Sequence, residues 1–306
     1  MKYIFGPVAS RRFGMSLGID LSPDEKVCNF DCIYCELQKA EKKDIQTNPA
    51  KVEDILSDVK KAIDKYEFDV VTITANGEPT LYPYLDELID ELKKLNLKTL
   101  ILSNSSTIDN PSIQKALKKL DIVKLSLDSV IEKTFKKIDR PMKNIELKNI
   151  IKGIREFSEM YDGKLIIEVL IVKGINDKIE EFKALNEVLN EINPVRIDIS
   201  TIDRPPAYDV EAVEYERLFE LSKEIKNQHI FIASRKNLAN KKESFTKEDI
   251  LNTLSKRPFS EDDVKNILDE NSQKIFFDLL ENDVIKEKIV SNTKFFMFDK
   301  GFGLNG

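Results

Sequence analysis

The chain has 306 residues, of which 41% are hydrophobic and 33% are charged, and its net charge at pH 7 is −6. This composition is typical of a folded globular protein and excludes a disordered chain. The sequence has neither an apolar run long enough to span a membrane nor the regions of a signal peptide at its N-terminus, so we expect a cytoplasmic protein without a membrane anchor. The negative charge gives no overall attraction to nucleic acid or to anionic membranes.

The first 15 residues contain two glycines and a proline, and they are predicted to form an irregular leader. Arg11 and Arg12 in this leader have two interpretations. They are either solvated loop charges or guanidinium groups that grip a carboxylate or a phosphate in a cavity, since arginine binds both in a bidentate way.

Short β-branched or apolar runs then alternate with segments whose apolar residues recur at helical spacing. The predicted strands are residues 17–21, 70–74, 99–102, 122–127, 165–172 and 195–199. The predicted helices are residues 52–63, 85–95, one that opens at 111, 144–159, 179–192 and 212–225, and residues 229–232 form one more strand or the exit from this region. Such alternation indicates parallel strands joined by right-handed crossovers. Six strands are fewer than the eight of a complete TIM barrel.

A change of pattern near residue 244 predicts a second, smaller domain over residues 244–306, after a first domain over 1–236 and a polar linker at 237–243. From residue 244 on, short helices follow one another without intervening strands, and Thr246 and Ser260 are placed to form capping boxes. Residues 284–290 and 295–298 flank a hairpin turn at 291–293. Three helices and a two-stranded wing predict a winged-helix-like domain.

All three cysteines lie in one stretch, Cys28-Asn29-Phe30-Asp31-Cys32-Ile33-Tyr34-Cys35, which reads C-x3-C-x2-C. An odd number of cysteines cannot all pair as disulfides, so we predict that the three thiolates hold one metal centre. A structural zinc site needs a fourth protein ligand, and the only histidine, His229, is far along the chain. Iron–sulfur clusters of the cubane type normally have four thiolate ligands, so three cysteines leave one iron open to an external molecule. A zinc loop completed by another group is the alternative.

With an aromatic residue, Tyr34, before the third cysteine, the motif resembles that of the radical S-adenosylmethionine (radical SAM) enzymes. The resemblance implies that Cys28, Cys32 and Cys35 hold one [4Fe–4S] cluster and that SAM chelates its fourth iron. It implies reductive cleavage of SAM to a 5′-deoxyadenosyl radical, with flavodoxin or ferredoxin as the external reductant. It also implies that the six strands form the family's partial (β/α)6 TIM-like barrel, so that the fold class is α/β.

Polar residues that follow the second and third strands match positions that face SAM in the resembling enzymes. Asn76-Gly77-Glu78 resembles the family's Gly-Gly-Glu motif, whose backbone contacts the amino group of SAM, although Asn76 replaces the first glycine. Close approach of a backbone needs a residue without Cβ, which Gly77 supplies. Ser103 and Asn104 follow the third strand, and we expect them at the same cavity.

Later strands carry further candidates. Ser126 and Asp128 end the fourth strand, where polar side chains of the resembling enzymes bond the ribose hydroxyls of SAM. The alternative is that Asp128 caps the next helix. Gly174 opens a loop that resembles the family's loop near the adenine.

Two charged residues of the last strands need partners or ligands. Glu168 lies within an apolar strand, where a carboxylate is costly unless paired, and we expect Arg204 or Arg196 to be its partner. Arg204 belongs to the tip Asp203-Arg204-Pro205-Pro206 after the sixth strand. We expect it either to bind the SAM carboxylate or the substrate, or to pair with Asp203.

The segments Phe5-Gly6-Pro7-Val8, Ser10-Arg11-Arg12 and Asp203-Arg204-Pro205-Pro206 resemble short members of the broad group related to the wyosine-base synthases of tRNA. Those synthases carry additional cysteines for a second cluster, which this chain lacks, so the resemblance does not extend to the wyosine reaction. The substrate stays open between an RNA base, a peptide or protein, and a small molecule.

Two other functions compete with a radical SAM enzyme. An iron–sulfur redox sensor would bind nucleic acid through the winged helix, but from residue 244 on the chain has nine Lys or Arg and twelve Asp or Glu. Phosphate binding needs the opposite sign of charge, which argues against DNA as a partner. A glycyl-radical activase would act on a partner enzyme, and a wing domain is unusual in that group.

Overall fold

The computed structural model describes residues 1–10, 12–226, 228–233, 242–290 and 293–298. Its strands are β1 (Ile4–Ser10), β2 (Gly14–Asp20), β3 (Val70–Thr74), β4 (Thr99–Ser103), β5 (Ile122–Ser126), β6 (Lys164–Ile171), β7 (Arg196–Thr201), β8 (Ile230–Ile232), β9 (Phe259–Ser260), β10 (Ile285–Val290) and β11 (Thr293–Phe298). Its α-helices are α1 (Val52–Lys65), α2 (Leu85–Lys94), α3 (Pro111–Leu117), α4 (Glu132–Ile138), α5 (Leu147–Met160), α6 (Ile179–Ile192), α7 (Tyr215–Ser222), α8 (Lys247–Leu254), α9 (Glu261–Ile267) and α10 (Glu270–Glu281).

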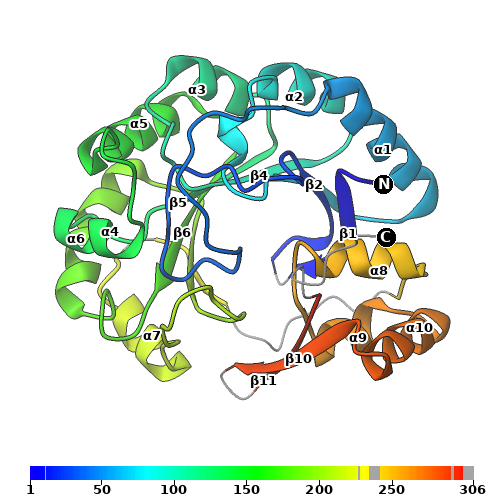
Figure 1. Cartoon of the computed structure of the whole chain (residues 1–306). Helices are drawn as coiled ribbons and strands as arrows, with labels where there is room; N and C mark the ends of the chain where they lie inside the picture. Colours follow the sequence, from blue (N-terminus) through cyan, green and yellow to red (C-terminus); the bar gives the residue numbers. More distant parts are fainter. Residues whose placement is uncertain (11, 227, 234–241, 291–292, 299–306) are drawn as a thin grey trace.

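The largest element is an eight-stranded sheet whose strands follow one another in sequence order from β1 to β8. Strands β1 and β2 are antiparallel, and every later neighbour pair is parallel. Helices α1 to α7 lie along the outer face of this curved sheet (Figure 1). The predicted α/β fold with a parallel sheet is therefore confirmed, and the arrangement is consistent with a partial barrel.

The two faces of the sheet differ in what they bury. Apolar side chains of one face, such as Ile19, Ile73 and Val123, pack against the surrounding helices in the main core. The opposite face carries a smaller apolar cluster to which Val70 and Leu100 belong. Successive strand residues point to opposite faces, so Lys124 and Glu168 lie on the same face as this second cluster. Polar and charged side chains are thereby placed in the interior of the curved sheet.

The predicted leader is wrong for residues 4–10, which form the edge strand β1. Its pairing with β2 shifts register between Phe5 and Val8, and Pro7 lies at this irregularity, a place where a strand tolerates proline. Helix α4 was also not predicted. Its buried residues Phe135 and Ile138 are too few to give a helical period over a long window.

The C-terminal unit consists of α8, α9, α10 and a three-stranded sheet in the order β10-β11-β9. The capping boxes at Thr246 and Ser260 are confirmed. The expected two-stranded wing is wrong in one respect, because β9 adds a third strand through pairing with β11. Residues 237–241 of the predicted linker and 291–292 of the predicted turn lie outside the described residues.

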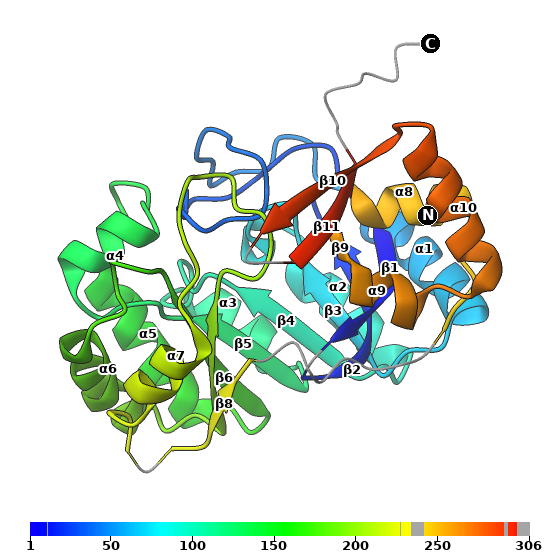
Figure 2. The same ribbon diagram turned by 90° about the horizontal axis from the view of Figure 1, so that it is seen from below.

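This unit is packed on the edge of the large sheet, beside β1 (Figure 2). Its core includes Val8, Ala9 and Met15 from β1 and β2 as well as its own apolar residues. The amide of Gly6 donates to the hydroxyl of Thr253 in a buried hydrogen bond of 3.2 Å, across 247 positions of sequence. The exposed hydrogen-bonding edge of β1 is thereby covered, which removes a site for unwanted strand pairing.

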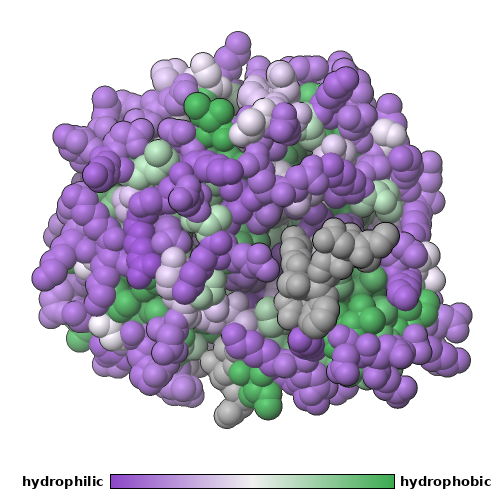
Figure 3. All heavy atoms as spheres, viewed as in Figure 1, coloured by the Kyte–Doolittle hydropathy of each residue, from purple (hydrophilic) through white to green (hydrophobic). Residues whose placement is uncertain are grey.

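The outer surface is mainly hydrophilic on the face seen in Figure 3, where apolar side chains form several small patches. This agrees with the high share of charged residues in the chain, 33%. Among the helices that the structure describes, none combines the length and the apolar character required to cross a membrane.

Candidate metal and cofactor site

The cysteine loop joins β2 to α1 and is fixed by backbone hydrogen bonds to segments that follow other strands and helices. The amide of Asp31 donates to the carbonyl of Asp139 after α4 (3.1 Å), and the carbonyl of Cys35 accepts from Ala207 after β7 (2.8 Å). These contacts bring residues that are distant in sequence to one end of the sheet. The three cysteines are free and half-buried.

Each cysteine sulfur has its own polar neighbour. The side-chain amide nitrogen of Asn104 lies 3.7 Å from Cys28 Sγ. The thiol of Cys32 donates to Asp139 Oδ1 at 3.4 Å, and the ammonium of Lys26 lies 3.6 Å from Cys35 Sγ. Nitrogen donors near the sulfurs stabilise thiolates and tune an iron–sulfur cluster. Two of the three sulfurs therefore have a nitrogen donor that favours a bound cluster.

Burial raises the pKa of the Cys28 thiol to about 12, and burial also raises the pKa values of Cys32 and Cys35. The thiolate is the form that binds metal, so a bound centre must supply the charge that offsets this cost. In the described ranges, no three His, Cys, Asp or Glu side chains are grouped to hold a single metal ion. Three soft sulfur donors on one loop are the donor set of a [4Fe–4S] cluster that has one iron left open.

The turn Asn76-Gly77-Glu78 packs directly on Val27, the residue before the first cysteine. Gly77 has φ +140°, and a Cβ there would lie 1.9 Å from the carbonyl oxygen of Val27. The amide of Val27 donates to the carbonyl of Asn76 (2.9 Å), and the amide of Glu78 donates to the carbonyl of Val27 (2.8 Å). Gly77 thus allows the backbone of the turn to lie directly against the backbone of the cysteine loop, and the two hydrogen bonds join these segments.

Glu78 and Ser103 contact each other. The buried carboxylate of Glu78 accepts hydrogen bonds from the Ser103 hydroxyl (2.8 Å) and the backbone amide of Asn104 (2.6 Å). It also accepts from the hydroxyl and the backbone amide of Thr80 (2.7 and 3.0 Å). Burial raises the pKa of Glu78, and these donors oppose that rise. The carboxylate therefore ties the turn after β3 to the loop after β4.

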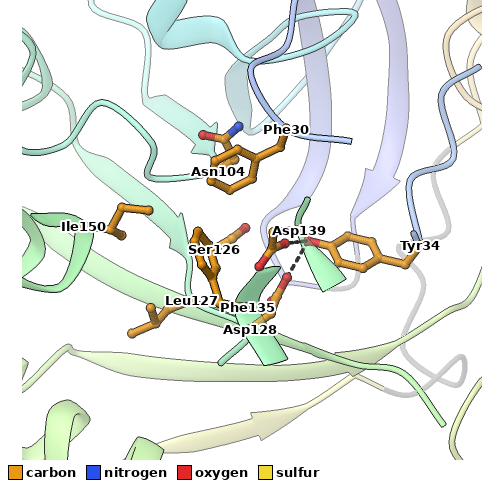
Figure 4. Close-up of a pocket in the computed structure, with 9 residues that line it drawn as sticks. All are labelled: Phe30, Tyr34, Asn104, Ser126, Leu127, Asp128, Phe135, Asp139 and Ile150. Carbon is orange, nitrogen blue, oxygen red and sulfur yellow. Dashed lines mark hydrogen bonds between the residues drawn. The ribbon is translucent and has the colours of Figure 1, made fainter. Parts of the chain in front are cut away.

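A pocket beside the cysteine loop contains four of the predicted site residues (Figure 4). It is lined by Phe30, Tyr34, Asn104, Ser126, Leu127, Asp128, Phe135, Asp139 and Ile150. The Tyr34 hydroxyl donates to Asp128 Oδ2 at 2.5 Å and lies 3.4 Å from Asp139 Oδ1. Tyr34, Asn104, Ser126 and Asp128, which come from three separate loops or strand ends, are brought together here.

Asp128 is a connector and not a helix cap. Its Oδ1 accepts from the amide of Leu170 on β6 (2.8 Å) while its Oδ2 accepts from Tyr34. The N-cap of α4 is Ile131, without a side-chain cap, so the capping alternative is wrong. Burial raises the pKa of Asp128 to about 6, and the hydrogen bonds from Tyr34 and Leu170 oppose that rise.

Gly174 and Arg204 are not among the residues that line this pocket. Gly174 has φ +73°, and a Cβ there would meet no atom within 4 Å. Arg204 Nη1 lies 3.5 Å from Glu36 Oε2, next to the last cysteine, and 3.9 Å from Asp203 Oδ1. The expected pairing with Asp203 is therefore the longer of its two ionic contacts.

The expected partners of Glu168 are wrong. Its Oε1 lies 2.7 Å from Lys124 Nζ on β5 and 2.9 Å from Arg12 Nη1, whereas Arg196 pairs with Asp198 at 2.7 Å. Lys124 lies on the strand next to β6, and Arg12 reaches the same interior face from the turn between β1 and β2. Arg12 is thus buried in an ion-pair cluster and is not a solvated loop charge; Arg11 lies outside the described residues.

Sequence reasoning missed Lys26 and Asp139. Asp139 follows α4, which the sequence did not predict, and no motif marks it. Lys26 stands two positions before Cys28, and a cation so close to a cysteine ligand was a signal that could have been used.

The chain is similar in sequence and in fold to known proteins. The family model described as the Radical SAM superfamily matches residues 26–186. A UPF0026 protein of Helicobacter pylori strain J99 is 42% identical over 96% of this chain and 96% of its own length. A crystal structure of Streptococcus suis SuiB bound to S-adenosylmethionine has a TM-score of 0.55 at 21% identity; it covers 68% of this chain and 48% of SuiB, so this chain spans about half of SuiB. A crystal structure of archaeal TYW1 has a TM-score of 0.48 at 18% identity and covers 74% of this chain and 75% of its own.

Radical SAM enzymes use a [4Fe–4S] cluster and SAM, and they need an external source of electrons. The matched segment begins two residues before Cys28 and ends within α6, so it contains the cysteine loop, the Asn76-Gly77-Glu78 turn and the pocket. The chain belongs to the radical SAM superfamily and, within it, to the UPF0026 proteins.

Proposed function

We propose that this chain binds a single [4Fe–4S] cluster and cleaves SAM reductively. The observation that carries the proposal is the cysteine loop, which holds all the cysteines of the chain and is fixed beside a pocket lined by Tyr34, Ser126 and Asp128. Cys28, Cys32 and Cys35 would hold the cluster, which would supply the electron for cleavage of a carbon–sulfur bond of SAM, and the resulting 5′-deoxyadenosyl radical would take a hydrogen atom from the substrate. Because the chain has only three cysteines, its thiolates suffice for one cluster.

The residues around the cluster have separate proposed tasks. The backbone carbonyls of Asn76 and Gly77 would accept hydrogen bonds from the amino group of SAM, since this turn contacts the cysteine loop. Ser126 and Asp128 would bond the ribose hydroxyls, because both line the pocket. Two candidates that do not line the pocket, Gly174 for the adenine and Arg204 for the SAM carboxylate or the substrate, are supported by their place in the sequence only.

The reaction needs a source of electrons and a substrate. We propose flavodoxin or ferredoxin as the reductant, and an RNA base, a peptide or protein, or a small molecule as the substrate. Without a further cysteine there is no thiyl relay, so a tyrosine or the substrate radical itself must complete the chemistry.

We propose that residues 244–306 are a winged-helix-like domain. The order of α8, β9, α9, α10 and the hairpin of β10 with β11 supports this proposal. Its excess of acidic residues argues against DNA binding, so we infer that it serves the first domain, residues 1–236, or a protein partner.

Anaerobic reconstitution tests the proposed function. The protein is loaded with iron and sulfide, reduced with dithionite and mixed with SAM, and 5′-deoxyadenosine is measured. We expect 5′-deoxyadenosine from the wild type and from Ile45→Ala, a control at a residue of the same loop that is 73% exposed. We expect loss of iron, sulfide and product from Cys28→Ala, Cys32→Ala and Cys35→Ala, since no other thiolate can replace the lost ligand.

Two results would redirect the proposal. Iron and sulfide bound without cleavage of SAM would favour the redox-sensor function. Full iron and sulfide in any one of the three cysteine variants would refute the assignment of the cluster ligands.

A further inference from the structure

Lys256 of the C-terminal unit forms an ion pair with the interior face of the large sheet. Lys256 lies in the loop between α8 and β9, and its Nζ is 2.7 Å from Asp20 Oδ2 at the end of β2. The side chains of Lys256 and Asp20 are 9% and 4% exposed. An ion pair so well shielded from water is costly to break, because the remaining partner is left as an uncompensated buried charge.

Asp20 also contacts the turn that follows β3. Its other oxygen, Oδ1, accepts from the amide of Asn76 at 2.7 Å and from the amide of Ser22 at 3.0 Å. Asn76 and Glu78 in turn bond the backbone of Val27. A continuous series of short contacts therefore runs from the C-terminal unit to Asp20, then to the Asn76-Gly77-Glu78 turn, and then to the cysteine loop.

The charge of Lys256 decides how Asp20 can act in this series. The ion pair with Lys256 fixes the position of the Asp20 side chain, so that its second oxygen faces the amides of Ser22 and Asn76. Hydrogen bonds from amides to a charged acceptor are stronger than those to a neutral one. Without Lys256 a buried charge loses its partner, and the Asp20 side chain is free to rotate or to draw in water. Either change weakens the bond to the Asn76 amide and frees the turn to move.

We propose that Lys256 is a positioning residue of the SAM site, so that the C-terminal unit completes this site from outside the parallel sheet. The inference depends on the proposed function in one respect, the assignment of the Asn76-Gly77-Glu78 turn to SAM. It gives the C-terminal unit a task in the first domain that requires no partner of its own.

A second ion pair between the same two parts of the chain supplies a matched control. Lys65 on α1 lies 2.6 Å from Asp249 on α8. This pair also attaches the C-terminal unit, but it is remote from Asp20 in the hydrogen-bond series. If Lys256 only attaches the unit, the loss of either lysine should have the same kind of effect.

The experiment compares wild type, Lys256→Met, Lys256→Gln and Lys65→Met. Hydrogen–deuterium exchange of the metal-free proteins reports on the amides of Ser22 and Asn76, and we expect at least tenfold faster exchange in Lys256→Met and no change in Lys65→Met. SAM titration of the reconstituted proteins should give about tenfold weaker binding for Lys256→Met at near wild-type iron content. Lys256→Gln keeps a hydrogen-bond donor for Asp20 and should fall between wild type and Lys256→Met, and it serves as the test variant if Lys256→Met does not fold.

The outcomes separate the two proposals. Equal exchange at Ser22 and Asn76 and equal SAM affinity in the Lys256 and Lys65 variants would overturn the positioning role. If the variants show the expected exchange pattern but the reconstituted wild type does not bind SAM, the proposed function is overturned while the contact between Lys256 and the turn stands.

Discussion

Replacing Gly77 by alanine tests whether the Asn76-Gly77-Glu78 turn and the cysteine loop behave as one unit. The new methyl group would lie 1.9 Å from the carbonyl oxygen of Val27, whereas ordinary contact begins near 3.4 Å, so the two segments must separate by about 1.5 Å. That separation breaks two backbone hydrogen bonds, each worth about 1 kcal/mol net. The φ of +140° adds about 1–3 kcal/mol of backbone strain for a residue with a Cβ. We therefore expect a total cost of about 3–5 kcal/mol.

The assay measures iron and sulfide content after anaerobic reconstitution, together with the melting temperature of the metal-free protein. We expect Gly77→Ala to melt at a lower temperature and to retain little cluster, because Val27 adjoins the first cysteine. Gly174→Ala is the control, since its φ is also positive but a Cβ there meets no atom within 4 Å. It should cost only about 1–2 kcal/mol and load normally. Equal melting temperature and equal iron content in the two variants would refute the reasoning.

Two further predictions concern the pocket and the interior ion pairs. Asp128→Ala removes a charge-assisted hydrogen bond worth about 1.5–3 kcal/mol, so SAM titration should show a roughly ten- to hundred-fold loss of affinity, and unchanged affinity would remove Asp128 from the site. Burial alone would raise the pKa of Glu168, but the cations of Lys124 and Arg12 outweigh it and lower the pKa to about 2, below the ordinary value of about 4.3. Ionised Glu168 therefore stabilises the fold above about pH 4.3, and this stability, on the order of 3 kcal/mol, is lost as pH falls toward about 2. Thermal melts at graded pH should show a steeper acid loss for wild type than for Glu168→Gln, and parallel curves would contradict the ion-pair cluster.

Most of the parallel strands could be predicted because they are short runs rich in valine, isoleucine and leucine. Such runs stand out from the polar segments on either side, as Val70–Thr74 does. The edge strand β1 could not, since Gly6 and Pro7 interrupt it and its packing partners lie at the other end of the chain. A local pattern does not contain the information about which distant segment will cover an edge.

The candidate site also has some features that a local sequence pattern predicts and others that depend on distant segments. The cysteine motif is local, so its three candidate metal ligands could be named from the sequence. The resemblance to radical SAM enzymes then pointed to the Asn76-Gly77-Glu78 turn, which contacts the cysteine loop. The partners of Glu168 depend on strand register and on where a turn places Arg12, which no sequence pattern discloses. Likewise Asp128 could be assigned either to a helix cap or to the cavity, and only the contacts with Leu170 and Tyr34 decide between them.

The shared core of β1 and the C-terminal unit has a consequence for how the protein is made. During synthesis β1 emerges long before Thr253, its partner 247 positions later. Contacts between such distant residues form slowly because a long loop must close first. Until then Val8, Ala9 and Met15 lack the C-terminal residues that pack on them, and β1 exposes an unpaired strand edge that can pair with strands of other chains. The order of synthesis therefore makes this edge the place where aggregation of an incomplete chain would begin.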